Sequence, residues 1–124
     1  MKIHQDNTDG SYRIIRHGAE GVQINNQLYA QSVVVTPDQL ISPWPPSTLM
    51  EMTLEHLKIA QTLDPEVMLL GTGANQQFPT REIMRPILQS GIGLEVMDTG
   101  SACRTYNILM GEGRRVVAAL IIST

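Results

Sequence analysis

Two short segments in the second half of the chain, residues 67–70 and 116–122, constrain its fold most strongly. Neither contains a polar residue, and each follows a segment whose apolar residues have helical spacing. A strand that is apolar at every position is typically buried on both faces, as in the central sheets of α/β proteins. The pattern therefore predicts an α/β fold, in three layers, with helices against a central sheet.

Residues 53–124 are predicted to alternate between helix and strand. Thr53 and Thr80 are suitable N-caps for two helices, and a third helix is expected over about residues 101–110, capped by Thr99 or Ser101. Strands are expected at residues 67–70, 94–97 and 114–122. Successive strand–helix–strand units form right-handed crossovers, so a mostly parallel central sheet is expected.

The first part of the chain has a different pattern. Residues 1–36 contain short β-prone runs separated by glycines and by the pair Asn25-Asn26, which suits a hairpin turn; they predict an additional N-terminal β-layer. Residues 37–52 hold four prolines and are predicted to be a proline-rich crossing loop. The whole chain, 1–124, is expected to form a single domain.

Composition excludes several function classes. Nine Lys and Arg against 12 Asp and Glu give a formal charge of −3, and the five aromatic residues are too few for a base-stacking platform, so no nucleic-acid partner is expected. The lone cysteine, Cys103, excludes an intrachain disulfide and a multi-cysteine metal site, and no metal or cofactor is predicted. With no transmembrane segment and no signal-peptide pattern, a cytoplasmic location is expected.

Two glycine-containing loops at strand ends are the candidate ligand site. The first follows residues 67–70, the second follows residues 94–97, and parallel strands would place both on one rim. The candidate ligand-binding residues of this rim are Gly71, Thr72, Gly73, Asn75, Thr99, Ser101 and Cys103. Glycine N–H groups can approach an anion, but the third glycine of a dinucleotide fingerprint and the Lys-Ser/Thr pair of a phosphate loop are missing. Turn-forming glycines and helix caps are the simpler interpretation.

No residue is identified as catalytic. Cys103 near a helix N-terminus and beside Arg104 could be a reactive thiolate, yet its position on the flank of an apolar helix face favours an inert, packed residue. Arg114 and Arg115 are interpreted as a solvated strand start rather than an anion clamp. The sequence thus leans against an enzyme.

Three residues are candidate partner contacts. Arg104 and Ile108 are expected on the helix face opposite its buried stripe. Trp44 could be an exposed recognition element, although a tryptophan that anchors a proline-rich loop to the core is the favoured alternative.

An ordered series of motifs resembles one known family. The motifs are Gly71-Thr72-Gly73 and the segments 91–99, 102–109 and 112–121, with a looser match at residues 21–25 and 32–37 and at Trp44. The family comprises small uncharacterised bacterial and archaeal proteins whose eukaryotic relatives are mitochondrial respiratory complex I assembly factor 3. The resemblance implies a three-layer α/β fold with an extra β-layer.

The resemblance also implies a role in assembly through protein contacts. The leading hypothesis is a non-enzymatic protein-binding or assembly module with a protein partner and peripheral association with a membrane-bound respiratory complex. The alternative is a small-ligand or anion-binding protein, or an enzyme, that uses the rim at residues 71–75 and 99–103.

Overall fold

The computed structural model describes residues 2–5 and 11–123. Residues 1, 6–10 and 124 lie outside the described residues. Its main sheet has six strands in the order β1-β6-β5-β9-β7-β8, and a second sheet has the order β2-β3-β4. The strands are β1 (Lys2–Gln5), β2 (Ile14–Gly18), β3 (Gly21–Ile24), β4 (Gln27–Tyr29), β5 (Val33–Val35), β6 (Gln39–Ser42), β7 (Val67–Gly71), β8 (Gly93–Met97) and β9 (Val116–Leu120). The helices are the 3-10 helix η1 (Leu49–Glu51) and the α-helices α1 (Leu54–Gln61), α2 (Arg81–Gln89) and α3 (Thr99–Gly111).

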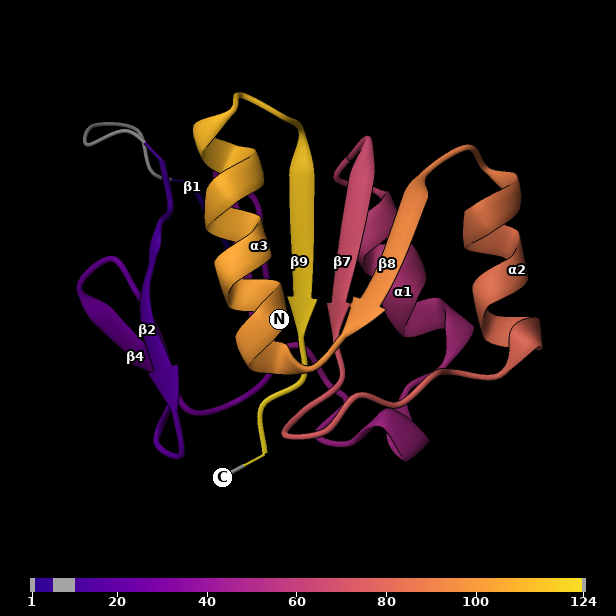
Figure 1. Cartoon of the computed structure of the whole chain (residues 1–124), viewed down its shortest axis with the longest axis horizontal. Coiled ribbons are helices and arrows are strands. Elements are labelled where there is room, and N and C mark those ends of the chain that lie inside the picture. The colour runs from indigo at the N-terminus through magenta and orange to yellow at the C-terminus, as the bar shows by residue number, and fades with distance from the viewer. Residues whose placement is uncertain (1, 6–10, 124) are drawn as a thin grey trace.

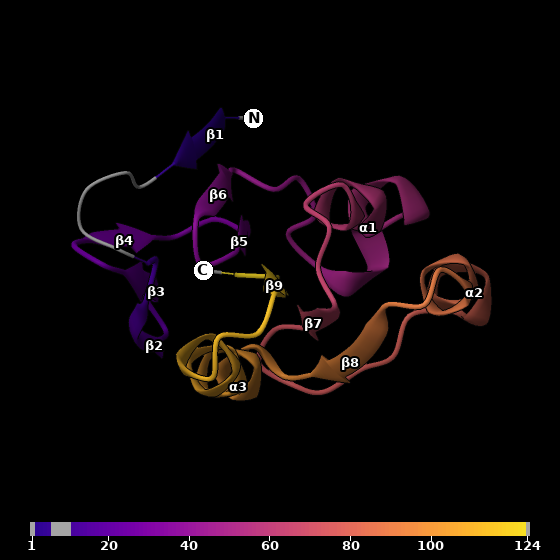
Figure 2. The same ribbon diagram turned by 90° about the horizontal axis from the view of Figure 1, so that it is seen from above.

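The helices lie on opposite faces of the main sheet. Figure 2 shows α3 and the small β2-β3-β4 sheet on one face, with α1 and α2 on the other. Figure 1 shows α3 running alongside β9, with β2 on its other side. The fold is therefore mixed α/β, and the central strands of the main sheet are covered on both faces.

Alternation along β7 and β9 explains why both strands are wholly apolar. Val67 and Leu69 of β7 pack into one buried cluster with α3, whereas Met68 and Leu70 pack into the other with α1 and α2. β9 divides its residues between the same two clusters. All residues of β7 and β9 are buried, as their sequences predicted.

The expectation of a mostly parallel sheet is wrong, because the sheet is mixed. β9–β7 and β7–β8 are parallel, but β5 pairs antiparallel with β9, and β6 pairs antiparallel with both β5 and β1. The parallel pairs are those built from segments joined by α2 and α3, whose length allows a crossover. β5 and β6 are joined by a tight turn, closed by a hydrogen bond from Thr36 N–H to Gln39 O at 2.8 Å, which reverses the chain.

Two expectations for the N-terminal part also need correction. Only β2, β3 and β4 stand apart from the main sheet, because the apolar residues of β5 are fully buried beside β9 and β1 pairs with β6. The proline-rich segment 37–52 is not only a loop, since it contains β6 and η1. Leu40 and Ile41 of β6 are buried on opposite faces, which gives this segment a place in the core.

Two local predictions are confirmed. Thr53 caps α1, and with His56 it forms a capping box in which Thr53 N–H donates to His56 Nδ1 at 3.0 Å. Asn25 forms the turn between β3 and β4 with a φ of 52°, a conformation that asparagine tolerates better than most residues.

Candidate functional site

The two glycine-containing loops meet at one edge of the main sheet, at the position predicted for them. Thr99 N–H donates to Gly73 O at 2.9 Å, and Gly73 N–H donates to Thr99 Oγ1 at 2.8 Å. The same Thr99 hydroxyl donates to Ile121 O at 2.8 Å. One side chain thus joins the end of β7, the start of α3 and the segment that follows β9.

The polar groups of this rim are largely satisfied by the protein itself. Thr72 N–H donates to Met97 O at 2.9 Å, and the Thr72 hydroxyl donates to Asn75 O at 2.6 Å. A Cβ on Gly71 would lie 3.0 Å from the Thr99 backbone, so this glycine allows β7 and α3 to approach each other. These contacts favour the interpretation that the glycines form a turn and allow a close approach between elements, rather than the interpretation that their N–H groups bind an anion.

Asp98, not Thr99 or Ser101, is the N-cap of α3. Its carboxylate accepts the Ser101 N–H at 2.8 Å and the Ser101 hydroxyl at 2.9 Å. These two hydrogen bonds lower the pKa of Asp98, so the carboxylate stays charged beside the positive end of the helix dipole. Thr99 is instead the first residue of the helix, and its hydroxyl donates to Ile121 O outside α3.

A hollow of about 340 Å³ remains at the rim, between the β2–β3 turn and the N-terminus of α3. Gly73 and Thr99 are the two predicted rim residues that line it, together with His17, Asp98 and Gly100 from the neighbouring segments. Thr72 and Cys103 are buried, at 5% and 1% exposure. Of the seven residues predicted to bind a ligand at the rim, only Gly73 and Thr99 therefore line this hollow.

Cys103 lies inside the core cluster between α3 and the main sheet. Burial raises the pKa of its thiol to about 12, although the positive charge of Arg104 acts in the opposite direction. A thiol with this pKa is protonated at neutral pH, and only the thiolate is an effective nucleophile. The environment of Cys103 matches a packing residue.

Trp44 is 1% exposed, which corrects its assignment as a partner contact. Its indole Nε1–H donates to His56 O at 3.1 Å, and its ring meets the His56 ring edge to face at 6.4 Å between centroids. Trp44 N–H donates to Ser32 O at 2.7 Å. The two contacts of the indole with His56 anchor the proline-rich segment against α1, which is the interpretation that the sequence favoured.

The outer face of α3 and the neighbouring strand β2 form a second candidate site. We call it the β2–α3 surface and define it by Ile15, Arg16, His17 and Arg104, which line a groove, and by the exposed Ile108, one helical turn from Arg104. Ile15 is 52% exposed and Ile108 is 62% exposed. Between the two elements lies a shallow groove of about 270 Å³. The prediction of exposure for Arg104 and Ile108 agrees with the structure.

Two residues that shape this surface were not found by sequence reasoning. Asn107 bonds to the backbone of Ile14, and His17 Nε2 lies 3.3 Å from Arg104 Nη1. Arg104 Nη2 also donates to Ser101 Oγ at 3.1 Å, so its guanidinium is held from two sides. No local motif marks Asn107 or His17, because their partners are about 90 residues away in the chain.

Fold and surface together define a small mixed α/β domain whose candidate sites are shallow surfaces over a tightly packed core. The chain belongs to the family described as "Protein of unknown function (DUF498/DUF598)", whose model matches residues 14–121. This result confirms the resemblance deduced from the motifs.

Relatives and solved structures agree with this assignment. The chain is 32% identical over 124 residues to "NADH dehydrogenase [ubiquinone] 1 alpha subcomplex assembly factor 3" of Danio rerio, a match that covers 98% of this chain and 70% of that protein. It spans 66% and 54% of the lengths of two further curated relatives.

Two solved bacterial structures share the fold. A crystal structure from Bordetella parapertussis has 36% identity and a TM-score of 0.84 over 94% of this chain and 100% of that one. An NMR structure from Xanthomonas campestris has 38% identity and a TM-score of 0.83 over 98% and 92% of the two chains. In the described part of this chain, no helix has the length and apolar character needed to cross a membrane.

Proposed function

We propose that this protein is a non-enzymatic, protein-binding module that takes part in the assembly of a respiratory NADH dehydrogenase complex. The proposal is supported by the similarity to curated relatives named as assembly factors for that complex, which extends over nearly the whole of this chain. Those relatives are longer than this chain, so the role proposed here is the one that this domain could perform by itself.

The observation that carries the proposal is the combination of apolar and basic side chains on the β2–α3 surface. Hydrogen bonds between Ile14 and Asn107 join β2 to α3, and Ile15 and Ile108 are the next residues along the chain. Both isoleucine side chains are more than half exposed. Ile15 lies next to Arg16 and Ile108 lies one helical turn from Arg104, so each apolar side chain has a positive charge nearby, and apolar patches with a polar rim mark interaction sites. A surface of this kind is suited to another protein rather than to a small molecule.

The charge of the surface specifies the chemistry of its partner. Arg16 and Arg104 line the groove, and none of the described residues that line it is acidic. This is notable in a chain with a formal charge of −3, because the surface has the opposite sign to the whole molecule. We therefore propose that the partner contributes acidic side chains around an apolar anchor, since complementary charges favour encounter and orientation.

The same proposal includes the location of the protein. It would act in the cytoplasm and associate peripherally with the membrane-bound complex through this contact. Disruption of the β2–α3 surface should then move the protein from the membrane fraction, where the complex is found, to the soluble fraction.

The test compares the unaltered protein with the double variant Arg104→Glu/Ile108→Asp in cells that lack the chromosomal gene. Both substitutions are on an exposed helix face, so the fold should be retained, and circular dichroism checks this. The amount of assembled NADH dehydrogenase complex on native gels should recover with the unaltered protein and with a control variant Arg85→Glu on α2, but not with the double variant. Equal recovery with all three proteins would contradict the role of this surface.

The competing proposal is a small-ligand or anion-binding role at the glycine rim. The hollow of about 340 Å³ at Gly73 and Thr99 supports it. The internal hydrogen bonds of the Thr72 and Gly73 N–H groups weigh against it, because these donors are already occupied. An NMR screen of metabolites and anions would favour this role only if the amides of Gly73 and Thr99 shift with saturation.

A further inference from the structure

A larger cleft lies at the opposite end of the main sheet, where β7 and β9 begin. Its volume is about 560 Å³, which is within the usual range of small-molecule sites. Leu63, Pro65 and Met110 supply apolar side chains to its lining. The charged residues that line it, among those the structure describes, are Asp38, Asp64, Arg114 and Arg115.

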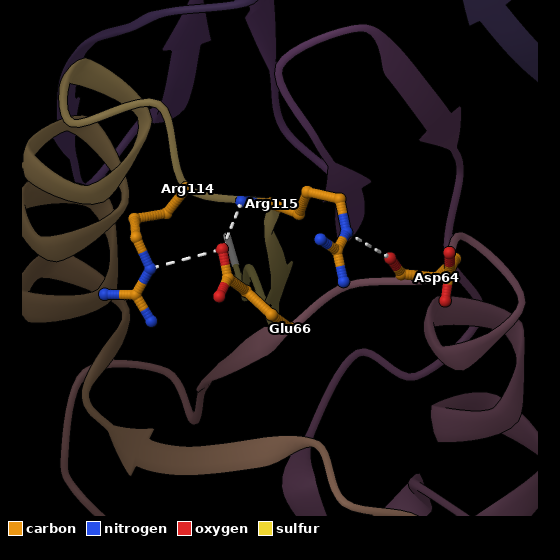
Figure 3. Close-up of polar contacts among 4 residues, drawn as sticks. All are labelled: Asp64, Glu66, Arg114 and Arg115. Carbon is orange, nitrogen blue, oxygen red and sulfur yellow. Dashed lines mark hydrogen bonds and ion pairs between the residues drawn. The ribbon is translucent and has the colours of Figure 1, made fainter.

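The two arginines of this cleft are held differently, as Figure 3 shows. Arg114 Nε is 3.2 Å from Glu66 Oε1, so a carboxylate neutralises this guanidinium. Glu66 Oε1 also accepts the backbone N–H of Arg115 at 3.0 Å, and these contacts lower the pKa of Glu66. Glu66 therefore remains charged and keeps Arg114 occupied.

Arg115 is oriented by a neutral backbone oxygen and forms no ion pair among the described residues, although the charge of Glu66 also acts on it. Its Nε donates to the backbone carbonyl oxygen of Asp64 at 3.3 Å. Asp64 has a φ of 56°, a left-handed turn conformation that directs the chain from α1 into β7. Among the described residues, the Nη groups of Arg115 have no hydrogen-bond partner. A planar guanidinium whose Nη groups are free is suited to bind a carboxylate.

Asp38 supplies a second unneutralised charge to the same cleft. One of its carboxylate oxygens accepts the Thr36 hydroxyl at 3.0 Å. Within the described part of the chain, Asp38 makes no ion pair with Arg115 or with any other cation. Opposite charges that line one cleft but remain unpaired can both be satisfied by a molecule that lies between them.

We propose that this cleft binds a small zwitterion, of the amino-acid or dipeptide class. Its carboxylate contacts the Nη groups of Arg115, its ammonium group contacts Asp38, and its aliphatic part packs against Leu63 and Met110. A simple anion is disfavoured because two aspartates line the cleft, and a simple cation is disfavoured because the Arg115 guanidinium, which forms no ion pair among the described residues, lies beside them. Arg115 is exposed and Arg114 is partly exposed just before β9, as expected for a solvated strand start, and the proposal adds a binding role for Arg115 that is independent of the assembly role.

The experiment is an amide NMR titration of the full chain with alanyl-alanine at constant ionic strength. Acetate and ethylammonium, which each carry one of the two charges, are the comparison ligands. We expect saturable shifts at Asp38, Gln39, Arg115 and Val116, with affinity for the dipeptide at least about tenfold above that for either comparison ligand. No saturation by about 10 mM dipeptide, or equal affinity for acetate, would overturn the proposal.

Variants separate the two charged contacts. Arg115→Ala should weaken dipeptide binding at least about tenfold, and Asp38→Asn should reduce it to the affinity for acetate. Arg85→Ala on α2 is the matched control and should bind normally. Arg115→Lys keeps the positive charge but removes the planar guanidinium. This variant should bind the dipeptide more weakly than the unaltered protein while keeping a native spectrum. Arg104→Glu/Ile108→Asp should retain dipeptide binding, so failure of the assembly role would leave this result unchanged.

Discussion

Asn107 pairs with the backbone of Ile14 as an adjacent strand would. Its Nδ2 donates to Ile14 O at 2.6 Å, and its Oδ1 accepts Ile14 N–H at 3.1 Å. β2 is an edge strand of the small sheet, so both of these backbone groups would otherwise need another partner. The amide of one helical residue thereby attaches the β2-β3-β4 sheet to α3.

Asn107→Ala should destabilise the protein by about 1–3 kcal/mol, because two backbone groups of Ile14 lose their partner. The free energy of unfolding from urea denaturation measures this effect. Ile108→Ala, at the next position of α3, is the control, and it should change stability by less than about 0.5 kcal/mol since its side chain is exposed. Equal effects of the two substitutions would show that Asn107 does not attach the sheet.

Thr99→Val should cost about 1–3 kcal/mol, because the Gly73 N–H loses its acceptor and the Ile121 carbonyl loses its donor. Valine keeps the shape of the side chain, so the change isolates the hydroxyl. Thr99→Ser retains the hydroxyl and should recover most of the loss in the same denaturation experiment. If serine were no better than valine, the hydrogen bonds would not be the source of the stability.

Gly100 and His17 should be energetically coupled. A Cβ on Gly100 would lie 2.7 Å from His17 Cε1, so Gly100→Ala must displace the imidazole. In a His17→Ala background the same substitution should stabilise the protein by up to about 1 kcal/mol through helix propensity. A double-mutant cycle should give a coupling of at least about 0.5 kcal/mol. Additive effects would contradict the close contact.

The stability of the protein should decrease between pH 9 and pH 12 partly because of Cys103. Burial raises the pKa of its thiol from 9.0 to about 12, so in this interval the unfolded chain ionises the thiol and the folded chain does not. The contribution is fully present below pH 9 and is lost as pH rises, at most about 1.4 kcal/mol per pH unit. The stability difference between the unaltered protein and Cys103→Ala should shrink from pH 9 to pH 11. A constant difference would contradict the raised pKa.

Cys103 should also resist modification in the folded state. Because the side chain is 1% exposed and its thiol is protonated at neutral pH, a thiol-specific reagent should react slowly with the native protein and rapidly in denaturant. Rapid modification of the native protein, measured by mass spectrometry, would instead point to a reactive thiolate and would revive the possibility of an enzyme.

Local sequence patterns determined the helices and the two buried strands. Thr53 and His56 are three residues apart, and the apolar runs of β7 and β9 are continuous, so each signal lies within a few residues. The glycine loops after β7 and β8 were also placed correctly, because parallel strands bring their carboxyl ends to one edge. The periodicity of apolar residues indicates which faces of a helix or strand are buried, and the prediction of these elements required no other information.

Tertiary structure alone decided which buried faces meet. Nothing local indicates that Val34 pairs with Ala119 or that Asn107 bonds to Ile14, because each pair is separated by more than 80 residues. The cleft that Asp38 and Arg115 line arises in the same way, from two turns brought together by the pairing of β5 with β9. Apolar burial is not directional, so the sequence by itself determined the buried segments, whereas long-range pairing decided the mixed sheet and the candidate sites.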